Sequence, residues 1–356
     1  MPEPNAPTCL IAAGGTGGHV LPSLAVAEAL RARGARVTFA GSPGRAEAQL
    51  VPEAGYELDT FEIAGLPRRP SASLVRSLLL AVKAPVACRR ILAHRRPDVV
   101  LGGGGYVAGP MIIAAATRRI PSALMEADAH LGLANRVAAP FAKRVFLASP
   151  IAGRAGGKYR VTGRPVPERS KPVPRDEARR LFDLPLEGPV LLVYGGSQGS
   201  QTINELVVES FGEEGPLVLH LAGERDYEAL RGRVQRTGYK LLPYTHDFGA
   251  ALAAADLALA RAGGSVYELA AAGTPAVLVP YPHATGDHQT KNALHFVQAG
   301  AAMLVPESSV DQAPALVTSL LADSGRRARM AEAMRREARP DAADEIAKEM
   351  LALAGV

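Results

Sequence analysis

Cysteine and tryptophan are nearly absent from this sequence, which contains two cysteines, Cys9 and Cys88, and no tryptophan. The cysteines lie far apart and outside any CxxC pair. This excludes a disulfide framework and a cysteine-based zinc site, and it indicates a reducing compartment. No stretch approaches the roughly 18–20 uncharged apolar residues of a transmembrane helix. The opening residues MPEPNAPT lack the basic and apolar regions of a signal peptide, so we expect a cytoplasmic protein.

Three glycine-rich stretches follow apolar runs, yet the usual nucleotide-binding signatures are missing from all of them. The stretches are GGTGGH (14–19), GGGGYVAGP (102–110) and GGSQGS (195–200). No Gly-Lys-Ser/Thr follows any of them, which excludes a P-loop. The expected second strand, RVTFAGS, ends without the acidic residue that a dinucleotide-binding fold uses, and the GxSxG motif of serine hydrolases is absent.

Asp-x-Asp, a common metal–diphosphate bridge, is also absent from the chain. If a nucleoside diphosphate leaves during the reaction, helix N-termini and backbone N–H groups must then stabilise its charge. That requirement is typical of metal-independent glycosyltransferases. We therefore expect diphosphate binding by the glycine loops, with no metal and no other cofactor.

Short apolar runs alternate with longer helical patterns, which predicts a parallel α/β architecture. The expected strands are 9–14, 36–41, 98–103, 122–127, 144–149, 189–196, 217–223, 240–244, 257–263 and 276–281. The two halves resemble each other, because an apolar run followed by a glycine loop opens both. Two such domains predict a cleft that the loops at the carboxyl ends of the strands face.

A stretch rich in proline and charge, near residues 164–176, separates the halves and indicates a linker. We therefore expect an N-terminal domain at 1–163 and a C-terminal domain at 164–340. The final amphipathic segment, 341–356, predicts a helix that packs on its own domain or crosses back to the first.

Acidic residues are missing from 63–97, which carries eight lysines and arginines among apolar residues. One interpretation is a core helix with a basic outer side. A second is a helix that lies on an anionic membrane with its apolar side down. Nucleic acid is disfavoured, because the segment has no aromatic residue to stack on bases.

The stretch 260–293 is the most informative part of the second half. Its glycine-rich turn opens a helix that carries Glu268, whose carboxylate suits the two hydroxyls of a ribose, although a glutamate there also complements the helix dipole. The loop GDHQTKNA then supplies Gln289 and Asn292. Amide side chains both donate and accept hydrogen bonds, as binding of sugar hydroxyls requires.

The three glycine stretches together with RAGGSVYELAAAGTPAVLVPYPHATGDHQTKNA (261–293), in this order and spacing, resemble the MurG family. That family transfers N-acetylglucosamine (GlcNAc) from UDP-GlcNAc to lipid I and so forms lipid II for peptidoglycan. The resemblance implies a GT-B glycosyltransferase of two Rossmann-like domains. It also implies a peripheral enzyme on the cytoplasmic face of the cell membrane, with 63–97 as its membrane contact and no nucleic acid as partner.

The resemblance also implies the site residues. His19 is the general base that takes the proton of the acceptor's 4-hydroxyl during one inverting displacement, because a helix N-terminus favours neutral imidazole. Donor and sugar contacts fall on Thr16, Gly17, Gly18, Asp128, Arg164, Ser197, Gln198, Thr245, Gly263, Gly264, Ser265, Glu268, Gln289 and Asn292. Acceptor contacts fall on Gly15, Gly104, Gly105, Tyr106, Glu126 and Asn135.

Two departures from the family pattern bear on these roles. Met125-Glu126-Ala127-Asp128 stands where the family usually has His-Glu-Gln-Asn, which removes one histidine as a base and favours His19. Arg164 stands where an asparagine is usual. The alternatives are another GT-B sugar transferase, a UDP-sugar epimerase, and a catalytically inactive scaffold that binds a nucleotide sugar.

Overall fold

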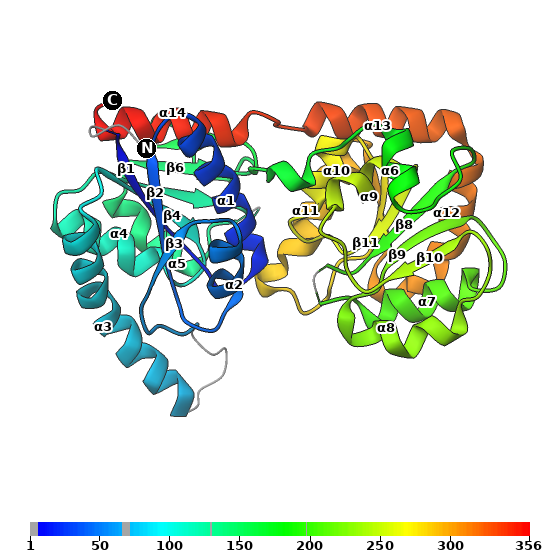
Figure 1. Ribbon diagram of the computed structural model, residues 1–356, viewed down its shortest axis with the longest axis horizontal. Helices are drawn as coiled ribbons and strands as arrows, with labels where there is room; N and C mark the ends of the chain where they lie inside the picture. The colour runs from blue at the N-terminus through cyan, green and yellow to red at the C-terminus, as the bar shows by residue number, and fades with distance from the viewer. Residues whose placement is uncertain (1–5, 66–71, 129, 197) are drawn as a thin grey trace. The chain divides into compact units, whose positions relative to one another are not determined.

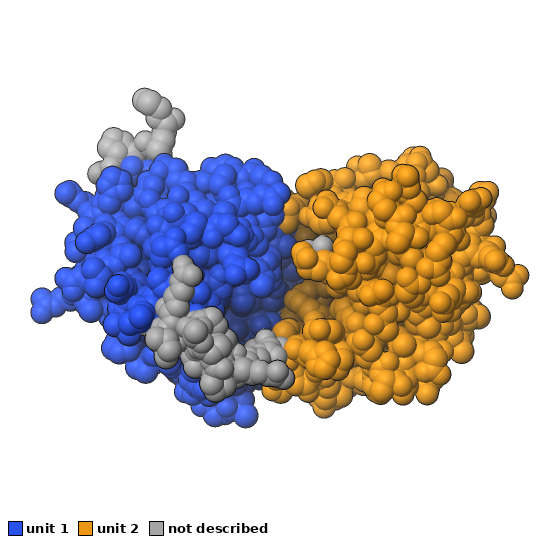
Figure 2. Space-filling model, turned by 90° about the horizontal axis from the view of Figure 1, so that it is seen from below, with its two compact units in different colours: residues 1–167, 339–356 blue, residues 168–338 orange. Residues whose placement is uncertain are grey.

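The computed structural model describes residues 6–65, 72–128, 130–196 and 198–356. The chain forms two compact units, which Figure 2 distinguishes by colour. Unit 1 comprises Met1–Pro167 and Arg339–Val356, and unit 2 comprises Glu168–Ala338. The boundary after Pro167 falls inside the stretch expected to be a linker.

Unit 1 is built on a seven-stranded parallel sheet with the order β3-β2-β1-β4-β5-β6-β7. Its strands are β1 (Thr8–Ala13), β2 (Arg36–Gly41), β3 (Glu57–Thr60), β4 (Val99–Gly104), β5 (Ser122–Glu126), β6 (Arg144–Leu147) and β7 (Tyr159–Val161). Its helices are α1 (Gly17–Ala32), α2 (Ala46–Glu53), α3 (Ala72–Arg95), α4 (Ala108–Thr117), α5 (Leu133–Ala138) and α14 (Ala342–Ala354).

The central strand β1 supplies the cores on both faces of this sheet. Cys9 and Ile11 pack with residues of α1 and α14, whereas Leu10 packs with residues of α3 and α4. Because successive strand side chains point to opposite faces, a central strand covered on both sides must be apolar throughout. Figure 1 shows the helices that cover the sheet.

Unit 2 is built on a six-stranded parallel sheet with the order β10-β9-β8-β11-β12-β13. Its strands are β8 (Val190–Tyr194), β9 (Leu217–Leu221), β10 (Tyr239–Leu242), β11 (Leu257–Ala260), β12 (Ala276–Leu278) and β13 (Ala302–Leu304). Its helices are α6 (Arg175–Leu181), α7 (Gln201–Phe211), α8 (Glu224–Leu230), α9 (Phe248–Ala254), α10 (Val266–Ala272), α11 (His288–Gln298), α12 (Ala313–Ala322) and α13 (Ser324–Glu337).

Each sheet has one point where the strand order reverses. In unit 1 the chain runs outward from β1 to β3 and resumes on the other side of β1 with β4. In unit 2 the same reversal lies between the neighbouring strands β8 and β11. Loops that leave the carboxyl ends of two such strands diverge and form a crevice, where doubly wound folds bind ligands. All the glycine-rich loops of the sequence follow these four strands.

The C-terminal helix α14 packs on unit 1. Its residues Ile346 and Met350 are fully buried in the core that α1 shares. Arg33, the C-cap residue of α1, pairs with Asp344 at 2.6 Å, and Arg144 on β6 pairs with Glu349 at 3.3 Å. Figure 1 draws this helix in red beside the blue α1. The last segment of the chain therefore belongs structurally to the first unit.

Candidate functional site

The first glycine loop joins β1 to α1. Thr16 has the extended backbone of an N-cap (φ −143°, ψ 158°), but its side chain makes no capping hydrogen bond. The first turn of α1 also contains no acidic residue. A helix start without a side-chain cap presents its N–H groups and positive dipole end to an anion.

The second glycine loop, after β4, packs directly against the first. Gly104 and Gly105 have φ of 110° and 73°, where side-chain-bearing residues are strained. A Cβ atom on Gly105 would lie 2.1 Å from the carbonyl oxygen of Gly14, and one on Gly104 would lie 2.6 Å from Cδ2 of His19. Only glycine at these positions lets the two loops approach so closely.

His19 lies at the contact between the two loops. It is half-buried in the first turn of α1, and its Nδ1 lies 3.3 Å from Oγ1 of Thr16. Its ring also packs against Gly104, because a Cβ atom added to that glycine would clash with the ring. Unit 1 thus brings together the residues 15–19 and 104–106 that the sequence analysis assigned to substrate binding and catalysis.

Glu126 and Asn135 form a second polar cluster in unit 1. Glu126 is 4% exposed and accepts hydrogen bonds from Gly132 N at 2.8 Å, Asn135 Nδ2 at 2.9 Å and Asp128 N at 3.2 Å. Burial raises the pKa of Glu126 to about 7, against the opposing effect of the Gly132 hydrogen bond. Met125, in place of the family's histidine, is buried in the core behind the sheet.

Arg164 connects this cluster to the first glycine loop. It is 7% exposed, and its guanidinium donates to the carbonyl oxygens of Ala127 and Gly18, both at 2.6 Å. The side chain expected to contact the donor therefore makes these hydrogen bonds inside unit 1. It fixes the backbone beside the start of α1 and places a positive charge there.

In unit 2, the loop after β8 is held in a tight turn by close backbone contacts. A Cβ atom on Gly199 would lie 2.2 Å from the carbonyl oxygen of Ala222. Ser200 caps α7 by accepting a hydrogen bond from Ile203 N at 3.5 Å. Gln198 is exposed on this loop. Ser197, the other residue expected at the diphosphate, lies outside the described residues.

The loop after β11 carries Gly263, Gly264 and Ser265, all half-buried, and leads into α10. Glu268 lies in the first turn of α10 and is also half-buried. Asn292 of α11 is fully buried, and its Nδ2 donates to the carbonyl oxygen of Ala262 at 3.2 Å. Asn292 thus supports this loop through its backbone.

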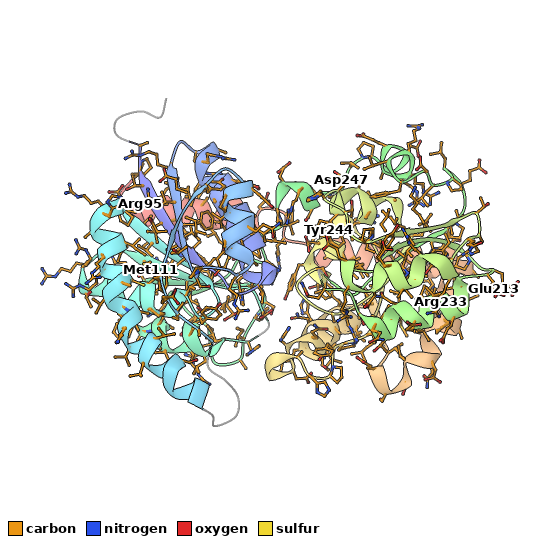
Figure 3. All side chains as sticks on the ribbon, turned by 60° about the horizontal axis from the view of Figure 1, so that its bottom comes forward. Arg95, Met111, Glu213, Arg233, Tyr244 and Asp247 are labelled. Atoms are coloured by element: carbon orange, nitrogen blue, oxygen red, sulfur yellow. The ribbon has the colours of Figure 1, made fainter. Side chains whose placement is uncertain are left out.

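Two further predicted residues of unit 2 make local hydrogen bonds. Oε1 of Gln289 accepts from Tyr281 N at 2.9 Å, which fixes the orientation of its amide group. Oγ1 of Thr245 accepts from Asp247 N at 3.1 Å and so shapes the loop after β10. Figure 3 labels Tyr244 and Asp247, which flank Thr245 in the sequence.

Sequence reasoning missed two residues that hold the loops in place. In unit 2, Arg261 is 7% exposed, donates through Nε to Ser200 Oγ at 3.0 Å and pairs with Glu307. In unit 1, Glu47 is fully buried and accepts from Gly15 N at 2.8 Å. Arg261 could have been found from the sequence, because an arginine directly after a buried strand indicates a cation at the start of the following loop. Nothing in the sequence near Glu47 indicates its partner.

Comparison with known proteins agrees with this architecture. Residues 9–147 match the glycosyltransferase family 28 N-terminal domain, and residues 190–346 match the glycosyltransferase family 28 C-terminal domain. The crystal structure of Acinetobacter baumannii MurG has a TM-score of 0.78 and 28% identity, over 98% of this chain and 99% of that one.

Curated relatives are more similar in sequence. A protein of Salinibacter ruber is 43% identical over 360 residues, which cover 98% of this chain and 97% of the relative. One of Acidithiobacillus ferrooxidans is 44% identical over 360 residues, 98% of this chain and 99% of the relative. Both are named UDP-N-acetylglucosamine–N-acetylmuramyl-(pentapeptide) pyrophosphoryl-undecaprenol N-acetylglucosamine transferase.

The two parallel-sheet units with glycine loops at both points of strand reversal define a GT-B glycosyltransferase. Within that class, the chain belongs to the MurG family of glycosyltransferase family 28. The fold and family expected from the glycine motifs are therefore confirmed.

Proposed function

We propose that this protein transfers GlcNAc from UDP-GlcNAc to the 4-hydroxyl of the MurNAc sugar in lipid I, with His19 as the base. The observation that carries this proposal is the packing of His19 between two glycine loops, beside a helix start without a side-chain cap. The 43–44% identity with transferases of that name, over 98% of the chain, supports the substrate pair.

The donor is assigned to unit 2. The loops after β8 and β11 offer backbone N–H groups and Gln198 to the diphosphate of UDP. Glu268 is placed in the first turn of α10, where its carboxylate can accept hydrogen bonds from both ribose hydroxyls. Thr245 contacts the base through its backbone, and the amide group of Gln289, fixed by Tyr281, contacts the sugar.

The acceptor diphosphate is assigned to the glycine loops of unit 1. In the transfer step the 4-hydroxyl oxygen attacks C1 of GlcNAc, and its proton passes to the imidazole of His19. The bond between C1 and the diphosphate oxygen breaks, and UDP leaves with the electron pair. One displacement of this kind inverts the configuration at C1. A positioned base contributes about 10²–10⁴-fold to such a step.

The membrane contact is assigned to α3. One side of this helix packs on unit 1 through Ala84, Cys88 and Leu92, which are buried. The apolar side chains of Leu79, Val82 and Val86 are instead 57%, 77% and 56% exposed.

The basic residues Lys83, Arg89 and Arg90 are exposed on the same helix. An exposed apolar face among basic residues fits an anionic lipid surface on which a polyprenyl acceptor resides. Arg68 and Arg69 of the expected basic segment lie outside the described residues. Among those described, no helix is both long and apolar enough to cross a membrane.

The proposal is tested by turnover of radiolabelled UDP-GlcNAc with a detergent-solubilised lipid I analogue, with and without EDTA. We expect label in the lipid under both conditions. His19→Ala should lower kcat by about 10²–10⁴-fold and leave binding of UDP-GlcNAc unchanged. His94→Ala, at an exposed histidine of the same unit, is the control and should retain full turnover.

Other outcomes point to the alternatives. Binding of UDP-GlcNAc without label transfer would favour a scaffold or an epimerase, and epimerisation of the free donor would separate these two. Loss of transfer with EDTA would contradict the metal-independent mechanism. Unchanged kcat in His19→Ala would exclude His19 as the base.

A further inference from the structure

Glu47 is a fully buried carboxylate directly behind the first glycine loop. In the described part of the chain, its hydrogen-bond donors are two backbone N–H groups and one hydroxyl, and no lysine or arginine pairs with it. Burial of an ionised carboxylate is costly unless its oxygens are hydrogen-bonded. The site must therefore hold these three donors in fixed positions.

The donors come from two different loops. Oε2 of Glu47 accepts from Gly15 N at 2.8 Å, in the loop after β1. Oε1 accepts from Ser42 N at 3.0 Å and from Ser42 Oγ at 2.5 Å, in the loop after β2. A Cβ atom on Gly14 would lie 2.2 Å from Oε1, and one on Gly41 would lie 2.6 Å from Cγ. Glycine at both positions makes room for the carboxylate.

Ser42 extends this arrangement to the second glycine loop. Its Oγ lies 3.2 Å from the hydroxyl of Tyr106. Because the Ser42 hydroxyl donates its one proton to Glu47, the hydroxyl of Tyr106 must be the donor to Ser42. The ring of Tyr106 in turn lies against Gly15, where a Cβ atom would be 3.0 Å from Cε1. The contacts therefore form a closed circuit around both loops.

We propose that Glu47 is a positioning residue for acceptor binding, acting through the Gly15 N–H and through Ser42 and Tyr106. This inference rests on the proposed function of unit 1. The Gly15 N–H and the Tyr106 hydroxyl proton are committed to this circuit, so neither serves as a donor to the acceptor diphosphate. Glu47 instead holds the loops so that the first-turn N–H groups of α1 and the ring of His19 meet the acceptor.

Glu47→Gln tests this role with little change in shape. A glutamine amide has one accepting and one donating end, so its NH₂ group must face either Gly15 N–H or Ser42, and one loop loses its acceptor. We expect the KM for the lipid I analogue to rise about tenfold or more, as loss of one buried hydrogen bond implies. The KM for UDP-GlcNAc should rise much less, because its nucleotide is assigned to unit 2 and only the transferred sugar is expected to reach Thr16, Gly17 and Gly18.

The matched control is Glu53→Gln on the same helix α2, where the glutamate is exposed and both KM values should be unchanged. Tyr106→Phe breaks the same circuit at its other end. If the circuit acts as a unit, its effect and that of Glu47→Gln on acceptor KM should be non-additive in the double variant.

Three results would overturn the inference: an unchanged acceptor KM in Glu47→Gln, an equal rise in both KM values, or full additivity with Tyr106→Phe. If Glu47→Gln does not fold, Ser42→Ala provides the same comparison of the two KM values. A wild-type protein that does not use the lipid I analogue would refute the proposed function itself. That result is distinguishable, because the inference concerns differences among variants of an active enzyme.

Discussion

Glu126 carries a carboxyl group that titrates near neutrality in the folded protein. Burial raises its pKa to about 7, from 4.5 in the absence of the fold. Between these two pH values the folded state holds a proton that the unfolded chain has released. The stability of unit 1 should therefore fall as the pH rises through this range, by at most about 1.4 kcal/mol per pH unit from this group.

Glu126→Gln should remove that dependence, because the glutamine stays neutral while its carbonyl oxygen can still accept a hydrogen bond. Denaturant unfolding of both proteins at several pH values between 5 and 8 measures the difference. We expect the variant to gain stability relative to wild type as the pH rises. A constant difference across this range would show that Glu126 does not titrate there.

At the residue scale, the sequence predicted which residue types form the loops better than it predicted their hydrogen-bond partners. The glycine loops and the helix that carries Glu268 could be predicted because their signals are local: an apolar run, a turn and a helix start. The partners of Glu47 could not, since Gly15 lies 32 positions away and meets it only after β1 and β2 have paired. The sequence also showed that Arg164 is a cation near the domain boundary. Its acceptors, the carbonyl oxygens of Gly18 and Ala127, could not be predicted because they depend on how three loops pack.

At the scale of elements, every expected strand is present, and the three that were not expected are β3, β7 and β13. Each of these lies at the edge of its sheet and has only three or four residues. An edge strand needs no continuous apolar run, because it pairs on one side and is less covered. The sequence ELDT of β3 shows this, with no residue fully buried. Pairing with the neighbouring strand, rather than composition, selects such strands.

Helix α3 gives a prediction at the same scale. Val82→Glu and Leu79→Glu each place a charge in the exposed apolar face, so binding to vesicles that contain anionic lipid should weaken about tenfold or more. Flotation or sedimentation with vesicles measures the effect. Leu186→Glu, at a residue of unit 2 that is 46% exposed, is the control.

Turnover of a water-soluble acceptor analogue should be unaffected in these α3 variants. Added salt should weaken the binding of wild-type protein, because Lys83, Arg89 and Arg90 contribute through charge. Equal vesicle binding by wild type and Val82→Glu would remove α3 as the membrane contact.

At the scale of the whole molecule, the two units have separate cores, and the core of unit 1 includes a segment that follows unit 2 in the chain. Met350→Ala removes a fully buried side chain of α14 and should destabilise unit 1 by about 2–5 kcal/mol. Calorimetry with and without UDP-GlcNAc checks this, because the donor should raise the melting temperature of unit 2.

Lys348→Ala, two residues away on the same helix and exposed, should leave both transitions unchanged. If Met350→Ala instead lowered only the transition that UDP-GlcNAc stabilises, the assignment of α14 to the first unit's core would be wrong.

The position of α14 also sets an order of events during synthesis. Residues 1–167 leave the ribosome first, yet the part of their sheet and of α1 that α14 covers stays exposed until the chain beyond unit 2 has been made. At about 5–20 residues per second, that delay is roughly 10 to 40 s. Unit 2 is continuous in sequence and can complete its fold within this interval. The unit synthesised first is therefore the last to finish folding, and the apolar surface that Ile346 and Met350 later cover stays exposed in the meantime.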